Sequence, residues 1–301
     1  MRNFTQHHWQ TLTEKDFAQL LNLALLEDTD GVGDLTCLAL VPETAQGAAT
    51  VVARTKGILA GVPLVPQILS AIDSALVWES GLGDSAELVC GAVVGTVRGT
   101  ARSLLAAERL VLNFLGRLSG IATLTRRYVD AVQGTKTNIY DTRKTTPGWR
   151  RLDKYAVLCG GGKNHRAGLY DAILIKDNHL ALGRQESTSF SAAEAVIWAK
   201  NFLRERFAEL PIVEVEVDTL DQLREVLSAE PDIVLLDNMS AAQIMEAVRI
   251  RNTVKPNVQL EASGGITLET VRDIAETGVE RISVGALTHT AVSLDFGLDW
   301  M

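Results

Sequence analysis

Between about residues 45 and 100, short runs of alternating apolar and polar positions are separated by glycines. Alternation with a period of two, bounded by turn residues, predicts β-strands. We therefore expect a largely antiparallel sheet whose strands lie in GAATVVARTKG, ALVWES, SAELVC and AVVGTVRG.

Two helices are predicted around this sheet. The first begins near Thr13, where Thr13 and Asp16 have the spacing of a capping box. The second runs from about Ala101 to Leu118, with leucines on one side and polar residues at three- and four-residue steps on another.

After about residue 137 the pattern changes, and short apolar runs alternate with amphipathic segments. The strand candidates are TNIYDTRK, DAILIKD, IVEVEVD, DIVLLDN, VQLEASG and RISVGAL. The helix candidates include SAAEAVIWAKNFLRERFAE, LDQLREVLSA, AAQIMEAVRIRN and LETVRDIAETG. This alternation predicts the βα repeat of a parallel sheet or barrel, so the chain is expected to be an α/β protein.

Polar residues or glycines stand at the end of each predicted parallel strand, where the functional residues of a βα barrel lie. In chain order these are Arg143 with Lys144, Lys176, Glu216, Asp237, the turn Ser263-Gly264-Gly265, and Gly285. Cations bind carboxylates or phosphates, and exposed N–H groups of glycine turns bind phosphate. The carboxylates suit Mg²⁺, ribose hydroxyls or a developing positive charge. Cations, then carboxylates, then glycine turns at successive strand ends indicate a ligand that combines a sugar with several anionic groups.

Charge and composition narrow the class of partner. The chain has a formal net charge of -8, which argues against nucleic acid, yet residues 141–180 hold eight Lys/Arg against four Asp. This local excess predicts a small anionic ligand. No apolar run approaches the roughly 18 residues of a membrane span, and the first residues lack a signal-like apolar core, so we expect no membrane association and a cytoplasmic location. The three cysteines, Cys37, Cys90 and Cys159, are expected to be reduced, buried thiols.

The continuous stretch DTRKTTPGWRRLDKYAVLCGGGKNHRAGLYDAILIKDNH resembles the signature of the quinolinate phosphoribosyltransferase family. Further segments agree, namely EDTDGVGDLT, ERLVLNFLGRLSGIAT, EVEVD, LLDNM, LEASGGI and ISVGALTHTAVSLD. The resemblance covers about residues 27–299. It implies an N-terminal α/β sandwich of residues 1–120 and a six-stranded, incomplete α/β barrel of residues 121–289. It also implies a C-terminal tail, about residues 290–301, that packs on the sandwich, and a homodimer.

The resemblance further implies a reaction. Phosphoribosyl pyrophosphate (PRPP) would donate its phosphoribosyl group to the ring nitrogen of quinolinate with loss of CO₂, giving nicotinate mononucleotide and pyrophosphate in de novo NAD synthesis. Lys144, Lys176, Glu216 and Asp237 would be catalytic, and Glu216 with Asp237 would hold Mg²⁺. Arg143, His165 and Arg166 would bind the quinolinate carboxylates, and Arg109 would come from the partner subunit. Lys144 and Lys176 would lie between quinolinate and the pyrophosphate, and Glu216 and Asp237 would also hold the ribose hydroxyls. Ser263, Gly264, Gly265 and Gly285 would bind the 5'-phosphate, with His289 nearby, and the substrate-binding residues would also include Thr142, Val284 and Ala286.

Three alternatives remain open at this point. Lys176 at a strand end is compatible with a Schiff-base aldolase, in which neighbouring cations lower the lysine pKa. A paralogue associated with molybdenum transport resembles the same family, although the intact DTRKTTPG and NHR motifs favour the quinolinate enzyme. A non-catalytic anion-binding module is disfavoured by the complete set of cations and carboxylates.

Overall fold

The computed structural model describes residues 2–11, 14–183 and 191–301. The chain divides into two compact units. We call the first the barrel unit; it comprises Met1–Gln6, Arg127–Lys144 and Gly162–Ala286. The second, the sandwich unit, comprises His7–Arg126, Thr145–Gly161 and Leu287–Met301. The units therefore interleave along the chain: residues 127–144 and 162–286 belong to the barrel unit, while residues 145–161 and the tail from residue 287 belong to the sandwich unit.

The sandwich unit is built on an antiparallel sheet of order β12-β1-β5-β3. Its strands are β1 (Gln46–Ala53), β3 (Val77–Ser80), β5 (Val93–Thr100) and β12 (Phe296–Trp300), and a separate pair is formed by β2 (Gly57–Ile58) and β4 (Glu87–Leu88). The alternating pattern of residues 45–100 is thus confirmed as an antiparallel sheet. The unit also contains η1 (Trp9–Thr11), α1 (Glu14–Thr29), α2 (Leu35–Leu40), η2 (Val62–Leu64), α3 (Val65–Ile72) and α5 (Arg150–Cys159).

The long helix α4 (Ala101–Ala131) continues well past Leu118, where the sequence analysis ended it. The C-terminal tail packs directly on two glycines of this helix. A Cβ atom at Gly120 would lie 2.2 Å from the carbonyl oxygen of Val292, and the Gly116 carbonyl accepts the Leu294 N–H at 2.9 Å. Glycine here allows close backbone approach and does not mark the end of a helix.

The barrel unit contains a six-stranded sheet of order β6-β11-β10-β9-β8-β7, in which all recorded pairings are parallel. The strands are β6 (Asn138–Tyr140), β7 (Ile173–Ile175), β8 (Val213–Val217), β9 (Ile233–Asp237), β10 (Gln259–Ser263) and β11 (Arg281–Ser283). All six predicted strands are confirmed. Nearly every residue of β8, β9, β10 and β11 is buried, so both faces of the sheet are covered, as is usual for parallel sheets.

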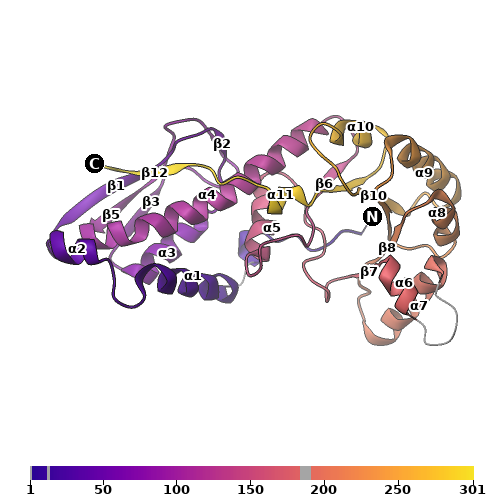
Figure 1. The fold of residues 1–301 in the computed structure, drawn as a ribbon, viewed down its shortest axis with the longest axis horizontal. Helices are drawn as coiled ribbons and strands as arrows, with labels where there is room; N and C mark the ends of the chain where they lie inside the picture. Colours follow the sequence, from indigo (N-terminus) through magenta and orange to yellow (C-terminus); the bar gives the residue numbers. More distant parts are fainter. Residues whose placement is uncertain (1, 12–13, 184–190) are drawn as a thin grey trace. The chain divides into compact units, whose positions relative to one another are not determined.

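Helices cover the outer side of this sheet, as Figure 1 shows for α8, α9 and α10. The four predicted helices are confirmed as α7 (Ala192–Arg206), α8 (Leu220–Leu227), α9 (Ala241–Val254) and α10 (Val271–Glu276), and α6 (Asp177–Leu182) and α11 (Ala286–His289) complete the described elements. Ser191, Thr219 and Ser240 each form a capping box at the start of α7, α8 and α9. Local sequence therefore fixes where these helices begin.

One expectation about a single residue is wrong, and another lies outside the described residues. Cys90 is exposed, although Cys37 and Cys159 are buried free thiols as expected. The proposed capping residue Thr13 falls in the part that is not described. Within the described residues, no helix combines the length and the apolar character needed to cross a bilayer.

Candidate active site

The carboxyl ends of the parallel strands meet at one edge of the barrel sheet. Asp237 at the end of β9 pairs in register with Ser263 at the end of β10. Ser283 at the end of β11 pairs with Tyr140 at the end of β6, and the Val284 N–H donates to the Tyr140 carbonyl at 2.9 Å. Residues that directly follow these strands, far apart in sequence, are therefore neighbours.

The acidic part of this edge consists of Glu216 on β8 and Asp237 on β9. The Lys176 ammonium, just after β7, donates to the Glu216 carboxylate. Burial raises the pKa of Glu216 and the charge of Asp237 adds to this, while the Lys176 bond acts in the opposite direction without cancelling the increase. Two nearby carboxylates that repel one another are suited to a cation or to ligand hydroxyls.

Two substitutions should move the pKa of Glu216 in opposite directions. Asp237→Asn removes a repelling negative charge and should lower this pKa. Lys176→Met removes a stabilising cation and should raise it. The measurement is an NMR titration of the Glu216 side-chain carboxyl carbon in ligand-free protein. Shifts of the same sign in both variants would contradict the geometry described here.

The cationic part of the edge is a loop segment, residues 164–166, held by the buried Asp141. The Asp141 carboxylate accepts the His165 N–H at 2.8 Å and the Asn164 side-chain amide at 2.7 Å. The segment ends at the buried Arg166, whose guanidinium donates to the Ala172 carbonyl at 2.9 Å. The loop is thus fixed by charge-assisted bonds, which are among the stronger ones.

Arg143 and Arg166 lie close enough to repel one another. Burial lowers the pKa of Arg166, and the charge of Arg143 lowers it further. The Nε atom of Arg143 is buried and has no hydrogen-bond partner among the described residues. A buried donor without a partner is costly, so this defect in Arg143, next to a second guanidinium group, indicates a place for a bound anion.

His165 lies in the barrel interior with both ring nitrogens engaged. Its Nε2 atom is 3.0 Å from the Glu214 carboxylate and 3.4 Å from the Glu261 carboxylate. Its Nδ1 atom accepts the Arg166 backbone N–H at 2.8 Å. These contacts connect the imidazole to the backbone that carries Arg166.

The protonation of His165 is subject to opposing influences. Burial lowers its pKa, but the charges of Glu214 and Glu261 outweigh burial and raise that pKa to about 9. The hydrogen bond from the Arg166 N–H to Nδ1 disfavours the protonated imidazolium form of His165, because a nitrogen that accepts a hydrogen bond needs a free lone pair. A doubly protonated ring would place two hydrogens between Nδ1 and the amide, which this hydrogen bond excludes. In this conformation the proton lies on Nε2, facing the two carboxylates.

A glycine turn follows β10. Gly264 has a φ of 93°, and a Cβ atom there would lie 2.2 Å from the Asn238 side-chain oxygen. The Asn238 N–H donates to the Ser263 carbonyl at 2.9 Å, which joins this turn to the end of β9. Only glycine fits such a position, and the turn leaves backbone N–H groups at the sheet edge where a phosphate can be bound.

Most predicted site residues lie at this edge or on the loops that leave it. Val284, Gly285 and Ala286 follow β11 and lead into α11. Thr142, Arg143 and Lys144 follow β6 as a loop and not as part of the strand, and the Thr142 hydroxyl accepts the Lys144 N–H at 3.0 Å. Two predicted residues belong to the sandwich unit: Arg109 on α4, with 66% of its side chain exposed and paired with Glu108, and His289 at the end of α11.

Sequence reasoning missed the buried acids Glu214 and Glu261 and the turn residue Asn238. A signal for the acids was present. In VEVEV, Glu214 stands two residues before Glu216, and residues two apart in a strand share a face. A second acid on the same face of an apolar strand predicts a buried ionic partner inside the barrel.

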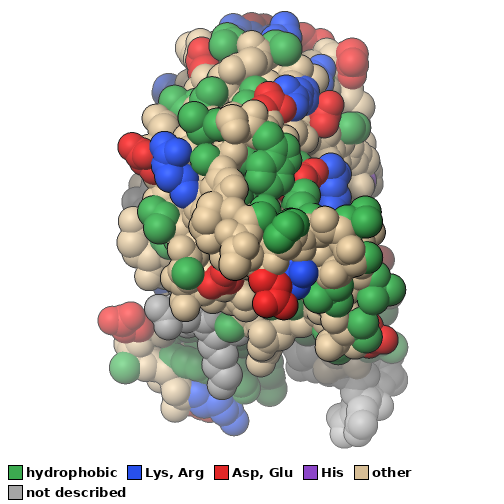
Figure 2. Space-filling model, turned by 90° about the vertical axis from the view of Figure 1, so that its left-hand side faces the viewer, with side chains coloured by type: hydrophobic (Ala, Val, Ile, Leu, Met, Phe, Trp, Pro, Cys, Tyr) green, Lys and Arg blue, Asp and Glu red, His purple; other side chains and the backbone are tan. Residues whose placement is uncertain are grey.

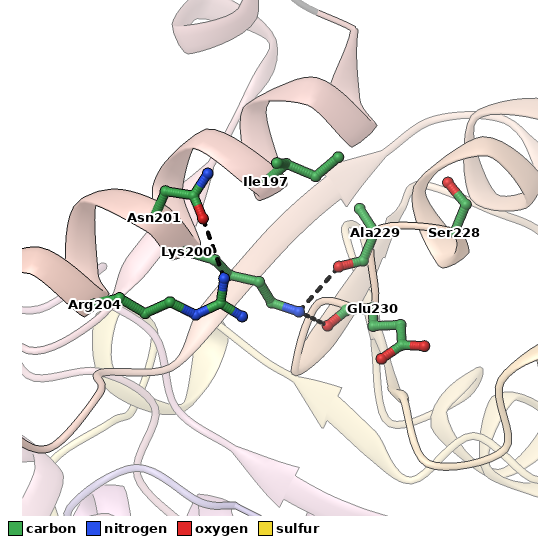
Figure 3. A pocket seen from close by; sticks show the side chains of 7 residues that line it. All are labelled: Ile197, Lys200, Asn201, Arg204, Ser228, Ala229 and Glu230. Atoms are coloured by element: carbon green, nitrogen blue, oxygen red, sulfur yellow. Dashed lines mark hydrogen bonds between the residues drawn. The ribbon is translucent and has the colours of Figure 1, made fainter.

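A surface groove of about 230 Å³ lies elsewhere on the barrel unit, between α7 and residues 228–230 (Figure 3). Lys200 spans it and donates to the backbone carbonyls of Ala229 and Glu230, just after α8 ends. These residues precede β9, so the groove lies toward the amino end of the strand that carries Asp237 at its carboxyl end. We assign Lys200 a structural role in binding the end of α8.

Comparisons with known proteins cover nearly the whole chain. The family model described as "Quinolinate phosphoribosyl transferase, N-terminal domain" matches residues 34–119, and the model of the C-terminal domain matches residues 121–299. The "Nicotinate-nucleotide pyrophosphorylase [carboxylating]" of Mycobacterium leprae is 45% identical over 279 residues, 92% of this chain and 94% of the relative. A probable enzyme of the same name from Bacillus subtilis is 41% identical over 93% of this chain and 92% of its own. The solved nicotinate-nucleotide pyrophosphorylase of Francisella tularensis has a TM-score of 0.89 at 36% identity and covers 99% of this chain and 100% of its own.

Proposed function

Because the chain belongs to the quinolinate phosphoribosyltransferase family, we propose that it transfers phosphoribosyl from PRPP to the ring nitrogen of quinolinate. The products are nicotinate mononucleotide, pyrophosphate and CO₂, and the reaction belongs to de novo NAD synthesis. The observation that carries this proposal is the separation of two charge sets at one sheet edge. Arg143 and Arg166 gather positive charge, while Glu216 and Asp237 form an acidic pair with Lys176 beside it.

The cationic set suits the two adjacent carboxylates of quinolinate. Arg143 and Arg166 bind them, since a carboxylate satisfies the buried Arg143 Nε and relieves the repulsion between the guanidinium groups. Thr142 and Lys144 complete the site on the same loop. The resemblance gives His165 a direct ligand role. We assign it a positioning role, because both of its nitrogens already have partners in the protein.

The acidic set suits the ribose and pyrophosphate of PRPP. Glu216 and Asp237 accept hydrogen bonds from ribose hydroxyls and stabilise positive charge at C1'. Their carboxylate oxygens are also the ligand type that Mg²⁺ prefers. A cation would relieve the repulsion by Asp237, which adds to the effect of burial in raising the pKa of Glu216. When bound with PRPP, Mg²⁺ neutralises charge on the pyrophosphate leaving group.

The turn at Ser263, Gly264 and Gly265 and the segment Val284, Gly285 and Ala286 bind the 5'-phosphate through backbone N–H groups. His289 at the end of α11 is assigned to the same phosphate. The assignment places the phosphate after the last strands of the barrel, where such ligands commonly lie.

The chemistry needs positioning and charge more than covalent help from the protein. The bond from C1' to the pyrophosphate oxygen breaks, and the quinolinate nitrogen supplies the electron pair for the new bond to C1'. The ring nitrogen becomes cationic and attracts the electron pair left on C2 when CO₂ departs. A proton from water then adds to C2. The Lys176 amine is engaged in an ion pair with Glu216 and is therefore not free to attack a carbonyl, which disfavours the Schiff-base alternative.

A homodimer with shared active sites is part of the proposal. The sandwich unit exposes five leucines on α1 and α2, namely Leu23, Leu26, Leu35, Leu38 and Leu40. Figure 2 shows hydrophobic side chains gathered on the face at the α2 end. Exposed apolar clusters of this kind mark protein interfaces. We propose that a second subunit covers them and receives Arg109 in its barrel. We also propose a cytoplasmic location, in keeping with the free thiols of Cys37, Cys90 and Cys159.

The test is a direct assay with PRPP, Mg²⁺ and quinolinate labelled in the C2 carboxylate. We expect release of labelled CO₂ and pyrophosphate in equal amounts, with nicotinate mononucleotide as the third product. Borohydride treatment with carbonyl substrates should trap no adduct on Lys176. Pyrophosphate release without CO₂, or a trapped lysine adduct, would contradict the proposed reaction.

A further inference from the structure

The first residues of the chain, Arg2–Gln6, run along the barrel unit, and we call them the N-terminal segment. The Arg2 guanidinium lies 3.2 Å from the Asp232 carboxylate, just before β9. The Arg2 backbone carbonyl accepts a hydrogen bond from the side-chain amide of Gln259, the first residue of β10, at 3.0 Å. Figure 1 shows this end of the chain beside β10. The segment is thus attached at the amino ends of the strands, away from the predicted ligands.

Phe4 carries the segment into the barrel interior, where only 5% of its surface is exposed. Its ring lies 4.3 Å from the His165 ring, centre to centre. The Arg281 guanidinium lies 5.0 Å from the centre of the Phe4 ring, and the same guanidinium donates to the Glu261 carboxylate. Phe4 therefore packs against the His165 imidazole and against Arg281, the cation that balances the charge of Glu261, one of the carboxylates beside His165.

Gln6 is both a hydrogen-bond donor and an acceptor to the backbone of the loop segment 164–166. Its side-chain oxygen accepts the Asn164 N–H at 2.9 Å, and its side-chain nitrogen donates to the Asn164 carbonyl at 3.2 Å. Asn3 adds a third connection, since its oxygen accepts from the Tyr140 hydroxyl at 3.3 Å and from Arg281 at 3.2 Å. The segment thus contacts the two residues that directly precede Arg166.

We propose that the N-terminal segment positions the quinolinate-binding loop, holding Asn164 and His165 so that Arg166 is oriented toward the substrate. This inference rests on the proposed function of Arg166. The sequence of contacts runs from Gln6 to the Asn164 backbone, from Phe4 to the His165 ring, and from His165 Nδ1 to the Arg166 N–H. A small displacement of Gln6 or Phe4 would shift the Arg166 guanidinium through these contacts. Displacement of a substrate-positioning group by about 1 Å can lower the rate about a hundredfold.

The experiment measures steady-state kinetics and thermal unfolding of Phe4→Ala, Phe4→Leu, Gln6→Ala and the control Thr5→Ala. Thr5 is exposed and lies between the two positions tested. We expect the KM for quinolinate to rise about tenfold or more in Phe4→Ala and Gln6→Ala, while the KM for PRPP changes little. Phe4→Leu should restore much of the quinolinate KM because it refills the apolar site, and Thr5→Ala should behave as wild type.

A double-mutant cycle with Arg166→Ala shows whether the segment acts through that arginine. In the Arg166→Ala background, Gln6→Ala should add no further increase in the quinolinate KM, because coupled positions are not additive. A folded Gln6→Ala protein with wild-type KM for quinolinate overturns the inference, even where Phe4→Ala fails to fold. If Arg166→Ala also leaves that KM unchanged, the proposed quinolinate site is wrong as well. If Arg166→Ala raises it, only the role of the N-terminal segment is wrong.

Discussion

Nicotinate should be turned over about a hundredfold to a thousandfold less efficiently than quinolinate, measured as kcat/KM with PRPP and Mg²⁺ present. Both compounds offer the same ring nitrogen, but nicotinate lacks the C2 carboxylate. The missing group leaves one of the closely spaced guanidinium groups of Arg143 and Arg166 without a counter-ion. Loss of a buried charge partner costs about 3–5 kcal/mol, and each 1.4 kcal/mol corresponds to a factor of about ten.

Arg166→Ala provides the matched control for this selectivity. The variant should lose much of its activity on quinolinate and little of its activity on nicotinate, so the ratio between the substrates should fall. Comparable kcat/KM values for the two substrates in the wild-type enzyme would refute the two-carboxylate site.

Two inactive variants, Arg109→Ala and Lys176→Ala, should complement one another. Arg109 is exposed on α4 of the sandwich unit, and Lys176 belongs to the barrel unit. If each barrel receives Arg109 from its partner, a mixed dimer has one complete site and one site with both defects. Random exchange of equal amounts makes half of the dimers mixed, so activity should return to about a quarter of wild type.

The measurement is CO₂ release from the whole mixture after the two chains are co-expressed or refolded together. Heterodimers isolated from it by two different tags should show about half of wild-type activity, since each has one complete site of two. Each variant mixed only with itself is the control and should stay inactive. Heterodimers as inactive as either parent would show that Arg109 acts within its own subunit or has no role in the reaction.

Much of the fold was predictable because its determinants are local. Uninterrupted apolar runs such as ILI in β7 and IVLLD in β9 have the short length of buried strands. The capping boxes at Ser191, Thr219 and Ser240 define helix starts within four residues. The polar ends of the strands could be read in the same way, since the fold places those ends at one edge of the sheet.

Other features depended on contacts between residues far apart in the chain. The helix α4 extends past Leu118, and the tail at residues 292–294 packs closely on its glycines. Cys90 belongs to an apolar run and is nevertheless exposed. A local pattern cannot distinguish a glycine that ends a helix from one that admits a neighbouring chain, because the neighbour is supplied by tertiary structure.

The sequence alone determined the class of the fold, the six parallel strands, and the residues at their ends that form the candidate site. Only the tertiary structure revealed how that site is supported. Glu214, Glu261 and Phe4 surround His165 inside the barrel, and Gln6 binds a backbone 158 residues away. Periodicity reports which face of an element is buried, but not which distant side chain meets it there. The ionic and aromatic partners of the substrate-binding loop are therefore set by packing, and residues near the start of the chain become part of the support for the site.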